Sequence, residues 1–273
     1  MPIWIAVLLG AVQGFAEFLP ISSSGHLALV QNLVDFSQYG GDALAFDIIL
    51  HLGTLVAVCI AFWGDIALLV RSALGLALNR FKVEKRGGRR LVVMLAIACV
   101  PLAVGALIEE YIEAAMSSTL FIGCALIITA VMLLVADKKG GGAKTEKDAT
   151  YLDALVIGLM QLCAVFPGIS RSGATICGGL FQGLKRDFAV RFAFLLSIPA
   201  VLGSAVFKLP DMARQGIPEG HLLPYIVGFL VAALCGYLAI WTVRTLMKKG
   251  GFKYFALYCA AVGFVTVMLS LIL

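Results

Sequence analysis

The sequence predicts an all-α integral membrane protein built from two inverted-topology repeats. Its composition is 61% hydrophobic and 14% charged, with mean hydropathy +1.01, whereas soluble domains carry about 25% charged residues. Several apolar runs are long enough to cross a bilayer, and short basic loops separate many of them. A polar stretch near the start of the chain also returns, with altered chemistry, 148 positions later.

The repeated stretch, Gly10 to Gly25, aligns without a gap with Gly158 to Gly173. Eight of the sixteen aligned positions are identical, which apolar composition alone does not explain. The copies differ at positions that carry chemistry, namely Glu17 against Val165, Ser23 against Arg171 and His26 against Ala174. The chain is therefore predicted to contain two related halves with different functional groups.

The first repeat is predicted at residues 1–136 and begins with a re-entrant helix pair over 2–36. Two apolar runs, each short for a spanning helix, are separated by Pro20 and the polar stretch that follows it. Non-helical backbone at membrane depth persists only inside protein or beside a watery cavity, so we expect the break to lie in such a place. The elements that follow are spans at 44–63, 91–108 (with a kink at Pro101) and 118–136, an interfacial helix at 66–79 and a link at 109–117.

The second repeat is predicted at residues 152–273, after a cytoplasmic linker over 137–151 that is rich in lysine and glycine. It starts with another re-entrant pair, over 152–183, which is broken around Pro167 and Gly168. Three spans are expected to follow, at 192–207, 222–243 and 252–273, with a mixed-charge loop at 208–221. The whole chain thus has six full spans.

Loop charges predict the orientation of the spans. The loops 71–90, 137–148, 184–191 and 244–253 hold 18 of the 21 basic residues, so we place all four on the cytoplasmic side. Each half then contains an odd number of full spans, which inverts the second repeat relative to the first. The two re-entrant pairs would enter from opposite faces, and their polar tips would meet near the midplane.

Composition also excludes several function classes. The net charge of +5 resides in short loops and gives no reason to expect a nucleic-acid partner. All seven cysteines lie in apolar runs without a CxxC pair, which predicts neither disulfides nor zinc. The expected partners are the lipid bilayer and a lipid substrate. A homo-oligomer is neither indicated nor excluded.

The polar residues of the two breaks predict an anion site. Gln13 and Glu17 are four residues apart and share a helical face. The stretch Ser22–His26 opens a helix, where free backbone N–H groups favour an anion. Arg171 opens the matching helix of the other repeat, and its planar guanidinium suits a phosphate. A carboxylate beside a phosphate would repel it, so we expect a divalent cation, Mg²⁺ or Ca²⁺, near Glu17.

Three patterns, Gln13-x-x-x-Glu17, Pro20-x-Ser-Ser-x-Gly-His26 and Pro167-Gly-x-Ser-Arg-Ser-Gly-x-Thr175, resemble the motifs of the bacterial undecaprenyl-diphosphate phosphatases, the bacitracin-resistance family. The resemblance extends over the whole chain. It implies a multi-pass enzyme of the bacterial cytoplasmic (inner) membrane that converts undecaprenyl diphosphate to the monophosphate. Such an enzyme recycles the lipid carrier of peptidoglycan synthesis and confers bacitracin resistance.

The resemblance also implies roles for individual residues. Catalysis is expected from Glu17, Ser23, His26 and Arg171. Substrate binding is expected from Gln13, Ser22, Ser24, Gly25, Ser170, Ser172 and Thr175. The metal is assigned to Glu17 and Gln13, although Gln13 is glutamate in some family members and its neutral amide weakens a two-carboxylate site. The nucleophile stays open between Ser23, His26 and water, and the site is expected to open towards the periplasm.

Two other functions remain consistent with the residues alone. Inverted repeats, broken helices and a midplane anion site are also features of secondary transporters and flippases for an anionic lipid or small anion. A structural membrane subunit is the weaker alternative, because it leaves four intramembrane polar groups without a role. His51 and Asp47, one turn apart within a span, are interpreted either as a structural pair or as part of the cavity lining.

Overall fold

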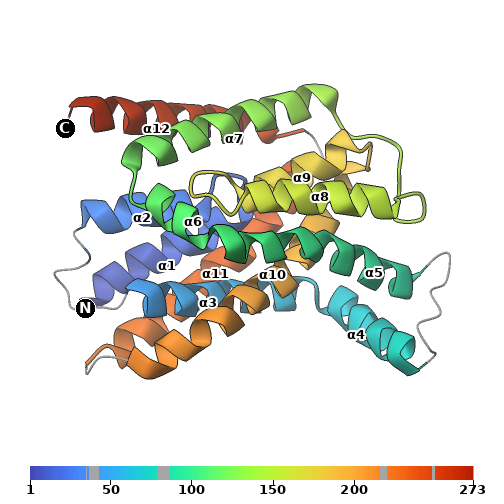
Figure 1. Ribbon diagram of the computed structural model, residues 1–273, viewed down its shortest axis with the longest axis horizontal. Coiled ribbons are helices and arrows are strands. Elements are labelled where there is room, and N and C mark those ends of the chain that lie inside the picture. The colour runs from blue at the N-terminus through green and yellow to red at the C-terminus, as the bar shows by residue number, and fades with distance from the viewer. Residues whose placement is uncertain (35, 37–42, 79–86, 216–219, 248–249, 273) are drawn as a thin grey trace.

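The computed structural model describes residues 1–34, 36, 43–78, 87–215, 220–247 and 250–272, and across these ranges its regular structure is helical (Figure 1). Five helices are long and apolar enough to cross a membrane, and a sixth span results if the bent pair α3–α4 counts as one. The prediction of an all-α membrane protein is thereby confirmed, and the predicted six spans match the upper of the two counts.

The first half contains two short helices around a break, followed by longer ones. Its elements are α1 (Ile3–Phe18), α2 (Ser23–Leu33), α3 (Ala43–Ala61), α4 (Trp63–Leu78), α5 (Gly88–Cys99), the 3₁₀ helix η2 (Val100–Ile108), α6 (Glu109–Met116) and α7 (Thr119–Lys139). Helices α3 and α4 meet at 89°, and the span predicted at 91–108 changes from α to 3₁₀ next to Pro101. Proline lacks the N–H that an α-helix needs there.

The second half repeats the short pair and then continues with three long helices. Its elements are α8 (Tyr151–Cys163), α9 (Arg171–Phe181), α10 (Arg186–Gln215), α11 (Leu222–Met247) and α12 (Phe252–Ile272). Helices α1 and α8 are apolar but contain only 16 and 13 residues, which is short for a full crossing.

Two segments predicted as connections are helical. The expected link at 109–117 contains α6, and the expected loop at 208–221 is helical as far as Gln215, where α10 ends. The apolar part of α10 already ends at Val206. Charge therefore marks where a helix leaves the apolar layer, and the helix itself can continue into water.

The first helix of each half packs against a helix of the other half, and the two packing partners are themselves equivalent. Helix α1 packs against α11, whereas its counterpart α8 packs against α5. Both crossings are close, because a Cβ added at Gly10 would lie 2.7 Å from the carbonyl oxygen of Gly228, and one added at Gly158 would lie 2.5 Å from that of Ala98. The last helices of the two halves, α7 and α12, pack against each other. This packing is expected for repeats related by an approximate twofold axis.

The two short pairs enter the helical bundle from opposite ends (Figure 1). Helix α1 starts at the left end and α8 at the right, so the breaks after them come together in the middle. The 137–148 linker and the start of α5, whose sequences are rich in basic residues, lie at the right end (Figure 1). This arrangement agrees with the predicted inversion, while the exact repeat boundaries stay a prediction.

An aromatic cluster supports the end of α1 next to Glu17. The ring of Phe18 contacts Phe194 edge to face at 5.7 Å, and Phe62 contacts the same ring at 5.7 Å. These three side chains come from α1, α10 and the bend between α3 and α4, and they belong to the main hydrophobic core. The end of α1 that carries the Glu17 carboxylate therefore rests on closely packed aromatic side chains.

Candidate active site

Helix α1 carries a buried pair of polar side chains near its end. Gln13 and Glu17 lie one turn apart, and the Gln13 amide nitrogen donates to Glu17 Oε2 over 3.1 Å. The other amide atom, Gln13 Oε1, is buried without a hydrogen-bond partner among the described residues. A buried acceptor without a donor is costly, so its position suggests that the site takes up a further group.

Ser22 lies in the turn between α1 and α2 and joins the two repeats. It is the one non-glycine residue of the described chain with a positive φ, 74°. Its hydroxyl caps α2 by accepting the N–H of Gly25 over 3.4 Å, and it also accepts the N–H of Gly168 over 3.1 Å. Ser22, which immediately precedes Ser23, therefore bonds to the backbone at the break of the second repeat.

Ser23 opens α2 and points at the carboxylate. Its hydroxyl donates to Glu17 Oε2 over 2.6 Å, a short distance typical of hydrogen bonds to charged oxygen. The hydroxyl of the next residue, Ser24, lies 3.5 Å from that of Ser22. Ser23 is thus the serine of this turn whose oxygen contacts the charged group.

Arg171 brings a positive charge from the second repeat. It is the first residue of α9, and its guanidinium lies 3.5 Å from Glu17 Oε1. The Glu17 side chain is buried, whereas the Arg171 side chain is about one-third exposed. A buried carboxylate needs such a partner, and a side chain that is partly exposed can also bind an anion.

The hydroxyls around Arg171 are bonded to backbone. Ser170 caps α9 by accepting the N–H of Gly173 over 3.1 Å, and Ser172 donates to the carbonyl of Leu19 over 3.1 Å. Thr175 donates to the carbonyl of Arg171 over 2.9 Å. In this arrangement they hold the start of α9, and their assignment to substrate binding stays a prediction.

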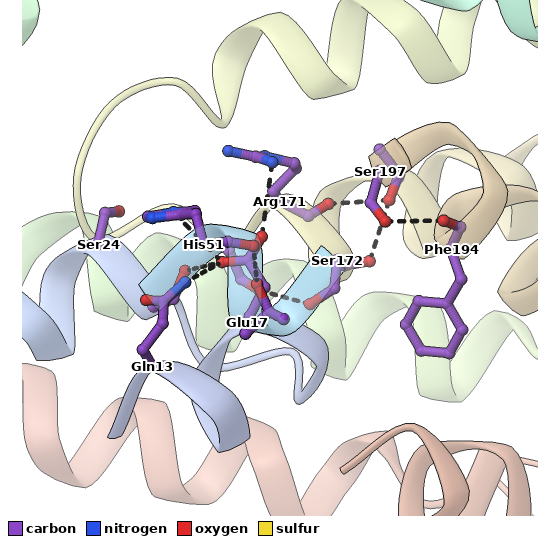
Figure 2. A network of polar contacts seen from close by, with 12 residues as sticks. Gln13, Glu17, Ser24, His51, Arg171, Ser172, Phe194 and Ser197 are labelled. Atoms are coloured by element: carbon purple, nitrogen blue, oxygen red, sulfur yellow. Dashed lines mark hydrogen bonds and ion pairs between the residues drawn. The ribbon is translucent and has the colours of Figure 1, made fainter. Parts of the chain in front are cut away.

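His51 of α3 also faces the carboxylate. Its Nε2 lies 3.8 Å from Glu17 Oε2, and its Nδ1 donates to the carbonyl of Asp47 over 2.8 Å. Figure 2 shows Gln13, Glu17, His51 and Arg171 converging from three helices. His51 is thus bonded to the backbone of Asp47 and also lies beside Glu17, and the choice between its two interpretations stays open. Asp47 instead accepts a hydrogen bond from Gln31 of α2 over 2.8 Å.

Both ring nitrogens of His26 are bonded to groups other than the Glu17 carboxylate. Its Nδ1 donates to the carbonyl of Ser22 over 2.8 Å, and its Nε2 lies 2.9 Å from the hydroxyl of Tyr258 on α12. The imidazole and the phenol also stack. The histidine next to Glu17 is therefore His51, whereas the sequence pattern had singled out His26.

The predicted divalent cation is compatible with the oxygen atoms on α1. Gln13 Oε1 has no hydrogen-bond partner among described residues and lies in the same side-chain pair as the Glu17 carboxylate. Within the described chain, no three His, Cys, Asp or Glu residues group as metal ligands. A cation held by one carboxylate, one amide oxygen and substrate phosphate remains consistent with both findings, because Mg²⁺ commonly takes few protein ligands.

Fold and site together define a multi-pass membrane protein with a charged, hydroxyl-rich centre where two broken helical segments meet. Residues 6–265 match the model of the family described as bacitracin resistance protein BacA. The chain belongs to this family.

Similar proteins cover the chain from end to end. An undecaprenyl-diphosphatase of Methanosphaera stadtmanae is 39% identical over 98% of both chains. One of Halothermothrix orenii is 37% identical over 99% of both, and undecaprenyl-diphosphatase 2 of Bacillus thuringiensis is 35% identical over 96% of both. The resemblance inferred from the motifs is thereby confirmed.

Proposed function

We propose that this protein hydrolyses undecaprenyl diphosphate to undecaprenyl phosphate and inorganic phosphate. Family membership and relatives named for this activity over nearly the whole chain support the proposal. The reaction would return the lipid carrier to cell-wall synthesis and lower the amount of diphosphate that bacitracin can sequester. The substrate is a polyprenyl diphosphate that reaches the protein from the bilayer.

One structural observation carries the proposal. Ser23 and Arg171, which open one helix in each repeat, both contact Glu17. The set combines a hydroxyl, a carboxylate that can take its proton, and a guanidinium that can hold phosphate oxygens in pairs. A site that only binds an anion needs the guanidinium and gains nothing from a buried carboxylate.

In the mechanism that this geometry favours, Ser23 Oγ attacks the terminal phosphorus and its proton passes to Glu17. The bond to the bridging oxygen breaks, undecaprenyl phosphate leaves, and water then hydrolyses the phosphoserine. Arg171 and the N–H groups that open α2 and α9 stabilise the phosphoryl oxygens, since phosphoryl transfer depends mainly on positioning and charge. Glu17 is favoured over His26 as the base, because both ring nitrogens of His26 are already bonded.

A divalent cation at Glu17 and Gln13 would neutralise charge on the diphosphate and on the leaving phosphate. Such a cation accounts for the unpaired Gln13 Oε1 beside the carboxylate. We therefore propose Mg²⁺ or Ca²⁺ as the cofactor.

We propose that the site opens on the periplasmic side of the bacterial cytoplasmic membrane. Helix α1 starts at the end of the bundle opposite the basic linker, and basic loops mark the cytoplasmic face (Figure 1). The transporter alternative shares this architecture, but relatives of full length that are named as phosphatases argue against it.

The test is inorganic phosphate release from undecaprenyl diphosphate by the purified protein, with and without EDTA. Wild-type protein should release phosphate in a cation-dependent way, and Arg171→Ala should lower release at least about 100-fold because charge stabilisation is the main catalytic contribution. Arg71→Ala removes an exposed arginine of α4 and serves as the matched control. A folded wild-type protein that releases no phosphate would overturn the proposal and call for a lipid-transport assay in liposomes.

A further inference from the structure

Two adjacent residues of α12, in the second half, contact the chain around the turn that precedes Ser23. The Tyr258 hydroxyl lies 2.9 Å from His26 Nε2, and the two rings stack with centroids 5.5 Å apart and planes at 14°. The neighbouring Cys259 donates its thiol to the carbonyl of Pro20 over 3.7 Å. Two consecutive residues of α12 therefore contact the chain on both sides of Ser22, at Pro20 before it and at His26, in the first turn of α2, after it.

The hydrogen bonds of His26 define its tautomer. Nδ1 lies 2.8 Å from the carbonyl oxygen of Ser22, which can only accept, so Nδ1 carries the hydrogen. In the neutral imidazole Nε2 is then an acceptor, and the hydroxyl of Tyr258 supplies the donor. Tyr258 thereby favours the form of His26 that bonds to the Ser22 carbonyl.

The Ser22 backbone needs external support. A positive φ is unfavourable for a residue with a Cβ, and such a conformation persists only where the surroundings impose it. The next residue, Ser23, must keep its hydroxyl 2.6 Å from Glu17 Oε2. A small rotation of this turn would move the hydroxyl out of contact, so the support of Ser22 determines the position of Ser23.

The turn of the second repeat is supported in an equivalent way by a helix of the first half. On α7, the Thr129 hydroxyl donates to the carbonyl of Gly168 over 2.9 Å and accepts the N–H of Ser170 over 3.2 Å. Helix α12 corresponds to α7, and Pro20 aligns with Gly168. In the second turn Thr129 alone bonds to the backbone, and the capping serine, Ser170, has an ordinary φ of −72°. In the first turn the capping serine, Ser22, has a positive φ, and His26 and Tyr258 provide the additional support.

We propose that Tyr258 is a positioning residue, which holds His26 so that its Nδ1 supports Ser22 and thereby places the Ser23 hydroxyl on Glu17. The proposal rests on the proposed phosphatase function for its effect on rate. The role of His26 in this arrangement is to bond to backbone, and the phenol acts on the reaction through it.

The first experiment compares Tyr258→Phe with wild type. The variant keeps the stacked ring and loses one hydrogen bond, so kcat for phosphate release should fall about three- to tenfold while KM changes less than twofold. Tyr254→Phe is the matched control, because Tyr254 is on the same helix, is exposed and makes no hydroxyl hydrogen bond with the described residues. Equal rates for the two variants would overturn the proposal.

A second pair of variants separates positioning from chemistry at His26. Asparagine can place an N–H where Nδ1 lies, and glutamine places its amide where Nε2 lies. His26→Asn should therefore keep activity within about tenfold of wild type, His26→Gln should lose more, and Tyr258→Phe should add nothing in the His26→Asn background. If both His26 variants are equally inactive, or if the Tyr258 and His26 effects multiply, the proposal is wrong.

A spectroscopic arm is independent of turnover. With ¹⁵N-labelled histidine, and three histidines in the chain, the His26 signals of wild type should show hydrogen on Nδ1 and a hydrogen-bonded Nε2 acceptor. Tyr258→Phe should shift the Nε2 resonance, and Tyr254→Phe should not. If wild type releases no phosphate, the proposed function fails, and this measurement still decides whether Tyr258 holds His26. Hydrogen on Nε2 in wild type would refute the inference.

Discussion

In both broken segments a serine caps the second helix, since Ser22 accepts the N–H of Gly25 and Ser170 accepts the N–H of Gly173. The aligned glutamines near the ends of α1 and α8, Gln13 and Gln161, are both buried. The segments differ where the side chains face the centre: the first supplies Glu17 and Ser23, and the second supplies Arg171. Identical positions build the shared backbone, and the positions that diverged carry the chemistry.

The difference also explains why each half depends on the other. Ser22 of the first turn accepts the N–H of Gly168 in the second, and Ser172 of the second donates to the carbonyl of Leu19 in the first. Glu17 is likewise buried against the guanidinium of Arg171. One segment alone would leave a buried carboxylate and several backbone groups without partners, so the site exists only in the assembled pair.

The largest effect is expected where the copies diverge. Glu17→Gln keeps the shape of the side chain but removes its charge and basicity, so phosphate release should fall about 10²–10⁴-fold. The aligned substitution Val165→Ala, on the other segment, should change the rate less than about threefold. Retained turnover in Glu17→Gln, with melting in detergent unchanged, would show that the chemistry lies elsewhere.

A large loss of stability is expected at the junction of the segments. Gly168 has φ 93°, and a Cβ there would lie 2.6 Å from the carbonyl oxygen of Ile122. Gly168→Ala should therefore lower stability by about 3 kcal/mol or more, read as a strong fall in melting temperature in detergent. Gly203→Ala is the control, because nothing lies within 4 Å of its added Cβ. Equal melting of the two variants would contradict the described packing.

A moderate and similar loss is expected at the two shared caps. Ser22→Ala and Ser170→Ala should each cost about 1 kcal/mol of stability, which is typical of a lost N-cap. Ser22→Ala should also lower phosphate release more than Ser170→Ala, because Ser22 adjoins Ser23. Thermal melting and turnover measured on the same preparations test both statements. If only one of the two substitutions lowered the stability, the two serines would not have equivalent capping roles.

The smallest perturbation tests the opposite orientation of the halves. In a cysteine-free background, Ser117→Cys should react with a membrane-impermeant maleimide added to intact cells, and Ala143→Cys should react only after permeabilisation. Both positions are exposed, and the α6–α7 connection and the 137–148 linker that carry them lie at opposite ends of the bundle (Figure 1). Ala143 is chosen over Gly142 because a Cβ at Gly142 would collide with the backbone of Gly183. Position 42, the other natural choice for the outer side, lies outside the described residues. Labelling of both from one side would refute the inversion.

Much of the fold could be predicted because membrane spans are a local property. Length and hydropathy located the long apolar helices, and the polar breaks between short apolar runs located the turns between α1 and α2 and between α8 and α9. Charge was a poorer guide to helix ends, as α6 and the end of α10 show. A charged side chain in water costs little on a helix, so the sequence pattern contains no stop signal there.

The site was predictable to the extent that it depends on helical spacing and on the repeat. Four-residue spacing placed Gln13 beside Glu17, and the alignment of the repeats placed Arg171 opposite Ser23. His51 was left between two interpretations, because its distance of 3.8 Å from Glu17 depends on how α3 is rotated against α1. No motif indicated Tyr258, which lies in an ordinary apolar span.

The sequence alone determined the all-α membrane class, the family and the residues that can carry the chemistry. These properties follow from hydropathy, helical periodicity and short motifs, which act within a few residues of the chain. The tertiary structure decided that Ser23 and Arg171 both contact Glu17, that His51 joins them, and that His26 turns to Tyr258. Such contacts join segments up to 232 positions apart, and helix packing, which no local pattern encodes, sets their distances.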